Sequence, residues 1–510
     1  MALVSKVGRK TLRARFAMAV LYLALTVGAV TTLYPFLVMM TTGFKGPTDQ
    51  NDSRLIPAFW SDETELLTKY RDDKYAGDMS AIASAAVGSE ADPGRLQRYE
   101  RFLAELPLDH WKAGFAIAPN QVTSKLTQRY QAFLRTRYRS IDDLNKAYLE
   151  LNTTFSAVTP PNENFDRPGW NPTAGAKWDD YQDFKRSLPA EFRVPIRLER
   201  IYQEWMRSKF ANQFDAVPAA AKGSATKFEE LRWPNAGELG PEFRATAAPP
   251  RYRDVATEDL WAKVDAGPMP IAAWEERFVQ ENASALRTEM SLRNYRYVLT
   301  YMLINGRALW NTAIFCALAI LVQLTVNPLA AYALSRYPMP ATAKILVFLL
   351  ATMAFPAEVA MIPSFLLLKD LHLLNTFWAL ILPGAANGYM IFLLKGFFDS
   401  LPQEIFESGQ LDGAREGTML WKLAMPLSKP VLGYLALLAF MAAYGAFMYA
   451  FLVAQDQRMW TLMVFIYQLQ QTAPKAVMMA AVTLAAVPTL IVFLLAQRTI
   501  MRGIVLPGEK

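Results

Sequence analysis

The chain has 510 residues, of which 53% are hydrophobic and 19% are charged, so it is long enough for several domains. Its single cysteine and two histidines, Cys316, His110 and His372, lie far apart, which excludes a disulfide framework and argues against zinc; we expect no cofactor. The net charge is +7, but residues 46–297 have 34 Lys and Arg against 37 Asp and Glu. The basic excess therefore belongs to the apolar remainder and does not indicate nucleic-acid binding.

The N-terminal region contains an apolar run at residues 16–40, directly after a basic segment. This run is long enough to cross a hydrocarbon core of about 30 Å. A cleaved signal peptide would have a shorter run followed by a small-x-small site, and neither feature is present. We therefore predict that residues 1–45 form a cytoplasmic N-terminus and an uncleaved first transmembrane helix.

Residues 46–297 are rich in charge, Trp, Tyr and Pro, and no run within them could span a membrane. Ser140 is placed to cap a helix that begins at Ile141. The apolar periodicity predicts helices within 91–105, 121–138, 141–150, 195–214 and 271–299. The region is therefore predicted to be a mainly helical soluble domain inserted after the first span.

Five further apolar runs follow, at about 308–334, 345–368, 376–396, 429–454 and 477–497. We therefore predict an all-α membrane protein with six transmembrane helices, in which residues 298–510 form a five-helix membrane core. Lys and Arg are concentrated on one side of this topology, and the short loops of the other side carry only Lys369, Arg458 and Lys475. The positive-inside rule then places both termini in the cytoplasm and residues 46–297 outside.

A polar segment at residues 399–430 separates two of these apolar runs. Ser400 and Gln403 have capping-box spacing, with Pro402 in the first turn of the predicted helix. A second helix is indicated by an apolar stripe that ends at Pro426 and consists of Met419, Leu420 and Leu423. The segment is therefore predicted to be two short helices joined by a bend.

The spacing of Glu407, Gly413 and Leu423-Ala424-Met425-Pro426 resembles the cytoplasmic EAA loop of permeases in binding-protein-dependent ABC importers. Leu411-Asp412-Gly413-Ala414 is similar to the Ile-Asp-Gly-Ala of the carbohydrate (maltose-type) permeases. Two departures occur, because Ser408 and Gly409 stand where the family prefers alanines. Both residues are small, so another surface can still approach closely.

The resemblance implies a permease subunit, in a bacterial inner membrane, of an ABC transporter that imports a carbohydrate. Its implied partners are ABC ATPase subunits, a second permease subunit, an extracytoplasmic solute-binding protein and membrane lipid. The sequence contains no G-x-x-x-x-G-K-[S/T] motif, so the chain cannot bind ATP through a P-loop and its energy would come from a partner.

In the family this loop inserts into a cleft of the ATPase subunit. Glu407 is therefore expected to contact a basic residue of the ATPase, Gly413 to set the bend, and Asp412 to cap the second helix. The second helix would be held against the spans by Leu423, Met425 and Pro426. Similar matches to the carbohydrate permeases occur at 311–313, 329–336, 355–363 and 497–504, whereas the tail at 505–510 departs from the family pattern.

Glu358 is the one acidic residue deep in a predicted span. It is either a pathway or gate residue or an acid at a helix end, since a charge at mid-membrane is costly. Asn387, Tyr389 and Tyr444 could hydrogen-bond to or stack on a sugar, or they could serve only in packing. These four residues are the candidates for the substrate pathway.

The sequence leaves three possible roles for residues 46–297. They could be a platform for the binding protein, a carbohydrate-binding module or a hydrolase. The alternative to a transporter is a membrane-anchored carbohydrate-active enzyme or sugar-binding protein that acts through this domain. A secondary transporter would need paired ionisable residues within the spans, and only Glu358 stands there. We expect a transport subunit with no catalytic residues and no enzyme activity.

Overall fold

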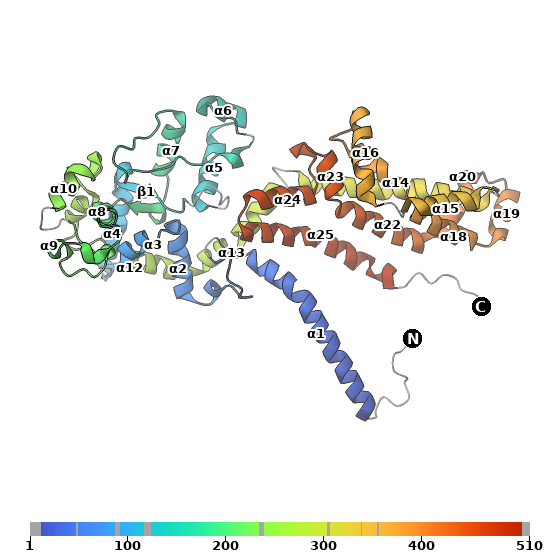
Figure 1. Ribbon diagram of the computed structural model, residues 1–510, viewed down its shortest axis with the longest axis horizontal. Helices are drawn as coiled ribbons and strands as arrows, with labels where there is room; N and C mark the ends of the chain where they lie inside the picture. Colours follow the sequence, from blue (N-terminus) through green and yellow to red (C-terminus); the bar gives the residue numbers. More distant parts are fainter. Residues whose placement is uncertain are drawn as a thin grey trace. The chain divides into compact units, whose positions relative to one another are not determined.

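The computed structural model describes residues 12–46, 49–86, 92–116, 124–152, 154–233, 239–302, 307–337, 339–353 and 356–501. These residues are mainly helical, with only two short strands among them, which confirms the all-α fold class (Figure 1). Two compact units are present, the first made of residues up to 294 together with 473–477, and the second of the rest. The basic residues Lys6, Arg9 and Lys10 and the tail from Arg502 onward lie outside the described residues.

The first unit contains one long apolar helix and a helical domain. Its elements are α1 (Leu12–Thr42), α2 (Glu63–Lys74), α3 (Met79–Ala86), α4 (Pro93–Glu105), β1 (Trp111–Ala113), α5 (Lys125–Arg137), α6 (Ile141–Tyr148), α7 (Ala176–Arg186), β2 (Arg193–Pro195), α8 (Leu198–Lys209), α9 (Ala219–Lys222), α10 (Leu239–Thr246), α11 (Thr257–Ala262), α12 (Ile271–Glu281) and the first part of α13 (Ala283–Thr300).

The expected helices of the inserted region are present, with the stretch 271–299 divided between α12 and α13, and α4, α5 and α6 each begin at a side-chain cap. The Ser140 side chain accepts a hydrogen bond from Asp143 N, so the predicted cap of α6 is confirmed. The sequence did not predict α2, whose N-cap is Asp62. The inward face of α2 includes the charged residues Lys69, Asp73 and Lys74, and this interrupts the apolar periodicity by which helices are recognised.

Two three-residue strands were also not predicted. Strands β1 and β2 pair antiparallel, with Lys112 opposite Val194. Strands this short carry almost no alternation signal, and they bring together segments that lie about eighty residues apart in the chain. The pair holds the centre of the inserted domain between two aromatic-rich cores, one around Trp111 and the other around Tyr202.

Buried ion pairs fasten α2 to α12 and α13. Glu275 of α12 is fully buried and contacts Arg71 at 3.1 Å and Lys74 at 2.9 Å, and it accepts a 2.8 Å hydrogen bond from Tyr75 Oη. Burial and the Glu275 carboxylate raise the pKa of Tyr75 well above its ordinary value, so its hydroxyl stays protonated and donates. Arg293 of α13 contacts Asp73 at 2.7 Å.

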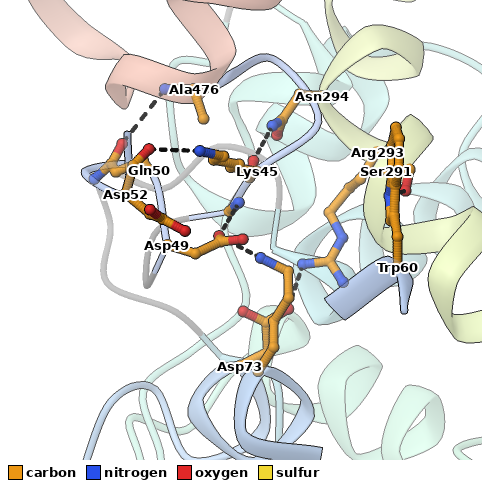
Figure 2. Close-up of polar contacts among 12 residues, drawn as sticks. Lys45, Asp49, Gln50, Asp52, Trp60, Asp73, Ser291, Arg293, Asn294 and Ala476 are labelled. Atoms are coloured by element: carbon orange, nitrogen blue, oxygen red, sulfur yellow. Dashed lines mark hydrogen bonds and ion pairs between the residues drawn. The ribbon is translucent and has the colours of Figure 1, made fainter. Parts of the chain in front are cut away.

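The segment that follows α1 is tied to α13 by a second polar cluster (Figure 2). The Lys45 side chain is 1% exposed and donates to the backbone oxygens of Asp52 and Arg54. Asn294 Nδ2 donates to the backbone oxygens of Gly43, at 3.0 Å, and Lys45, at 2.6 Å. The first and last segments of the insertion are therefore held together where it leaves and rejoins the apolar helices.

The second unit is a bundle of apolar helices in which α14 packs against α18 and α22, and α15 packs against α18. It contains the last part of α13 and then α14 (Ala308–Arg336), α15 (Thr342–Met353), α16 (Ala357–Asp370), α17 (Phe377–Ile381), α18 (Gly388–Asp399), α19 (Gln403–Leu411), α20 (Glu416–Thr418), α21 (Met425–Leu427), α22 (Lys429–Tyr444), α23 (Met448–Val453), α24 (Leu462–Thr472) and most of α25 (Lys475–Met501).

Three described helices, within α1, α14 and α25, are long and apolar enough to span a membrane, and two bent helix pairs raise this number to five. The predicted spans 345–368, 376–396 and 429–454 are not continuous helices. The first of these runs is divided between α15 and α16, with Pro356 as the N-cap of α16. The second bends by 53° between Gly384 and Gly388, and the third is interrupted after Tyr444. Proline and glycine within apolar runs explain the breaks.

Candidate functional site

The polar segment 399–430 forms a helical hairpin at one end of the membrane bundle (Figure 1). Its first helix is α19, and its second runs from Glu416 to Leu427. The middle of the second helix, Met419–Ala424, is a π-helical stretch, a feature found frequently at functional sites. We refer to residues 403–427 as the hairpin.

The turn of the hairpin is built around Gly413. Its φ of 77° lies in the left-handed region, where a side chain would cause strain. Gly413 N donates to Gln410 O at 2.9 Å, and Ala414 N donates to Gly409 O at 3.0 Å. These two bonds are the Schellman arrangement that ends a helix with a left-handed glycine. The turn expected at Gly413 is therefore present.

Two capping expectations are wrong. Ser400 ends α18, and its hydroxyl donates to Phe397 O, whereas the N-cap of α19 is Pro402, which has no capping side chain. Asp412 is the C-cap of α19, and the N-cap of the second helix is Arg415. The left-handed turn places four residues, 412–415, between the two helices, so Asp412 is too far back along the chain to cap the second one.

The two helices of the hairpin pack closely because Gly409 has no side chain. A Cβ atom at Gly409 would lie 3.1 Å from Leu423 Cδ1 and 3.8 Å from Met419 Cγ. Met419, Leu420 and Ala424 are buried, and Leu423 is half-buried. The small residue at 409 therefore allows close packing between the two helices of the hairpin, whereas close approach of another protein stays a prediction.

Polar contacts join the hairpin to the end of α14. Tyr332 Oη donates to Glu416 Oε2 at 3.0 Å, and Arg336 Nη2 donates to Phe398 O at 2.8 Å. The Arg336 guanidinium also lies 3.6 Å from the centre of the Phe406 ring, a cation–π contact. An open groove of about 840 Å³ is bordered by Tyr332, Arg336, Phe406 and Glu416, and Glu407 and Gln410 also line it. The sequence showed Arg336 only as a residue at the end of a span and gave no sign of this contact.

Several side chains of the hairpin, at its tip and at the edge of this groove, are exposed. Glu407 and Trp421 are exposed, and Leu411 at the tip is 90% exposed. Ser408 is also exposed, and its hydroxyl donates to Ile405 O within its own helix. Glu407 makes no ion pair with any residue that the structure describes. An exposed leucine and tryptophan on the same hairpin as this carboxylate are suited to contact with another protein.

The proposed pathway residues are not gathered into one site. Asn387 caps α18 at the bend of the fourth span, and its backbone N–H donates to Asn327 Oδ1 at 2.8 Å. Asn327 is fully buried in α14, so this polar junction lies inside the bundle. Tyr389 follows in α18 and is half-buried. The bend allows α15 to approach, because a Cβ atom at Gly388 would lie 2.5 Å from Leu349 O.

Tyr444 and Glu358 lie elsewhere in the second unit. The Tyr444 hydroxyl is buried and donates to Ala485 O of α25, so it is already used in helix packing. Glu358 is exposed in the first turn of α16, where the helix dipole favours an acid. Among the residues that the structure describes, no group of three His, Cys, Asp or Glu could hold a metal ion.

Comparisons with known proteins concern the second half of the chain. Residues 327–505 match the family described as "Binding-protein-dependent transport system inner membrane component". The chain is 29% identical to Protein LplC of Bacillus subtilis over 47% of this chain and 85% of LplC. It is 27% identical to the polygalacturonan/rhamnogalacturonan transport system permease protein YtcP of the same organism, over 46% of this chain and 87% of YtcP. It is 29% identical to the maltodextrin transport system permease protein MalD of Streptococcus pneumoniae, over 46% of this chain and 86% of MalD.

Proposed function

We propose that the chain is an inner-membrane permease of a carbohydrate ABC importer, and that its hairpin is the surface through which a separate ATPase drives transport. ATP binding and hydrolysis in the ATPase would move the hairpin. The membrane bundle would then alternate between inward-open and outward-open states. The chain itself would carry no enzyme activity, in line with relatives that are named as transport permeases.

The observation that carries this proposal is the combination of a rigid inner side and a free outer side in one hairpin. On the inner side, Gly409 packs on Leu423 and Tyr332 bonds to Glu416, so movement of the hairpin must move α14. Toward solvent, Leu411 at the tip and Glu407 at the edge of the groove are exposed and available to a partner. A hairpin of this kind can transmit force to the helices that it contacts, because its own close-packed interior resists deformation.

We propose a carbohydrate as the solute, because two of the relatives are named for transport of polygalacturonan, rhamnogalacturonan or maltodextrin. The break at Asn387 is the best placed of the candidate contacts, since discontinuous helices expose backbone and side-chain polar groups within a membrane bundle. Tyr389 is the next candidate. Tyr444 is a poorer one, because its hydroxyl already donates to Ala485 O.

The charge distribution supports an arrangement in which the hairpin and both termini face the cytoplasm and residues 46–297 lie outside. In that arrangement the inserted domain is available to an extracytoplasmic solute-binding protein. A second permease subunit would complete the pathway, as implied by the family. The long helix α1 has no buried residue in its apolar window, so it needs lipid or another subunit around it.

The docking role of Glu407 predicts the effect of reversing its charge. Glu407→Lys should abolish co-purification of the ATPase and reduce solute uptake at least about tenfold, because a charge-assisted contact becomes a repulsive one. Glu407→Gln should give an intermediate loss. Both effects are measured by pull-down of the ATPase and by uptake of labelled solute in cells.

The matched control is Glu404→Lys, which reverses an equally exposed acid one turn earlier in α19. It should leave assembly and uptake near the level of the unmodified protein. Normal ATPase association in Glu407→Lys, with the protein inserted in the membrane, would remove Glu407 from the docking surface.

A further inference from the structure

The inserted domain contains a cavity of about 630 Å³, well within the ~300–1,000 Å³ of small-molecule sites. Its walls come from the end of α2, from β1, from α5, from the loop 156–164 and from α7. All of these elements belong to the first unit. None of the residues lies within the part of the chain that matches the permease family.

Four of the five charged residues in the cavity wall are neutralised by partners. Lys74 contacts Glu275 at 2.9 Å and Lys177 contacts Glu150 at 2.6 Å. The two acids are also paired, Asp78 with Arg200 and Glu163 with Lys185. These charges therefore cancel locally, and they neither attract nor repel a ligand strongly.

The fifth charged residue is Lys112, at the centre of β1. Its ammonium makes no ion pair or hydrogen bond to any residue in the described part of the chain. Burial is the largest cause that lowers the pKa of Lys112, and the charge of Arg200 lowers it further; Asp166, Asp78 and Glu163 raise it, in that order. A half-buried cation without a contact partner is costly, and an incoming anion would relieve that cost.

The rest of the wall is suited to a ligand rich in hydroxyl groups. Gln131, Thr127, Asn162 and Asn164 line the cavity with side-chain amides and a hydroxyl. Gln131 uses its amide N–H groups on the backbone oxygens of Ser156 and Val158, and its amide oxygen accepts no hydrogen bond from any residue that the structure describes. Such groups can each accept from or donate to a sugar hydroxyl.

We propose that this cavity binds a hydroxylated carboxylate of the uronic acid class, with its carboxylate paired to Lys112 and its hydroxyls bonded to the amide side chains. One unpaired cation matches one carboxylate, whereas a phosphate group is usually held by several cations or by an Arg cluster. This assignment goes beyond transport and does not depend on the proposed ATPase coupling.

The test uses the purified full-length protein in detergent, without ATPase or solute-binding protein, and digalacturonate as the probe. Calorimetry should detect saturable binding of digalacturonate and at least about tenfold weaker binding of the neutral disaccharide lactose. Lys112→Met should weaken digalacturonate binding at least about tenfold, and Lys112→Arg should retain most of it. Lys146→Met, which removes an exposed lysine of α6 outside the cavity, should leave binding unchanged.

A pH series gives a second readout. The ligand requires the protonated amine, whose pKa in the free protein is lowered, so affinity should fall as pH rises from 7 toward the ordinary lysine range. This fall should be absent in Lys112→Arg. The proposal is overturned if neither disaccharide binds at millimolar concentration, if lactose binds as tightly as digalacturonate, if inorganic phosphate binds more tightly, or if Lys112→Met binds normally.

Discussion

Gly413→Trp should abolish solute uptake while the protein still inserts in the membrane and remains folded. A side chain at φ 77° costs about 1–2 kcal/mol, which a protein of this size can absorb. No heavy atom lies within 4 Å of a Cβ built at Gly413, so the indole would project outward instead of disrupting the hairpin. The substitution would therefore alter the surface that is presented to the ATPase. Uptake of labelled solute and ATPase pull-down measure the effect.

Two companion variants separate backbone strain from loss of the surface. Gly413→Asn introduces a residue that tolerates the left-handed conformation and should retain most of the uptake. Gly417→Trp places the same indole on the second helix, at another position where a Cβ has open space. It should impair uptake less than Gly413→Trp if the contact is centred on the turn. Normal uptake in Gly413→Trp would refute the docking role of the turn.

Glu275→Ala should destabilise the inserted domain by about 3–5 kcal/mol, because it leaves a buried cation without its counter-ion. Lys74 is 3% exposed, and Glu275 is its only ion-pair partner among the described residues. Arg71 and Tyr75 lose the same carboxylate. The change is measured as a lower melting temperature of the purified full-length protein and as faster proteolysis within residues 46–297.

The neighbouring residue on α12 provides the control. Glu276 is exposed, and Glu276→Ala should change stability by no more than about 0.5 kcal/mol. Equal melting temperatures for Glu275→Ala and Glu276→Ala would show that the buried cluster does not hold α2 to α12. If Glu275→Ala loses transport while ATPase binding is intact, transport requires a folded inserted domain.

Much of the hairpin could be predicted from sequence because its determinants are local. A left-handed glycine, an apolar stripe and a proline each act within a few residues, and their spacing gave the two helices and the turn. The capping expectations failed for Ser400 and Asp412 because helix starts depend on where the preceding helix ends. Here α18 extends to Asp399, and the Schellman turn moves the second N-cap to Arg415.

The features that could not be predicted depend on contacts between distant segments. Hydropathy shows that the run 376–396 is apolar, but not that it bends between Gly384 and Gly388. The charged inward face of α2 is explained by its ion pairs with Glu275 and Arg293, which lie about 200 residues further along the chain. The cavity around Lys112 joins five separate segments, so no local pattern could have indicated it.

The docking claim is tested most directly by side-specific labelling at the hairpin tip. Leu411→Cys, in a background where the buried native cysteine is removed by Cys316→Ala, places one thiol at a 90% exposed position. A membrane-impermeant maleimide should label this variant only from the cytoplasmic side, and assembly with the ATPase should protect it. Labelling from the outside, or equal labelling with and without the ATPase, would contradict the account.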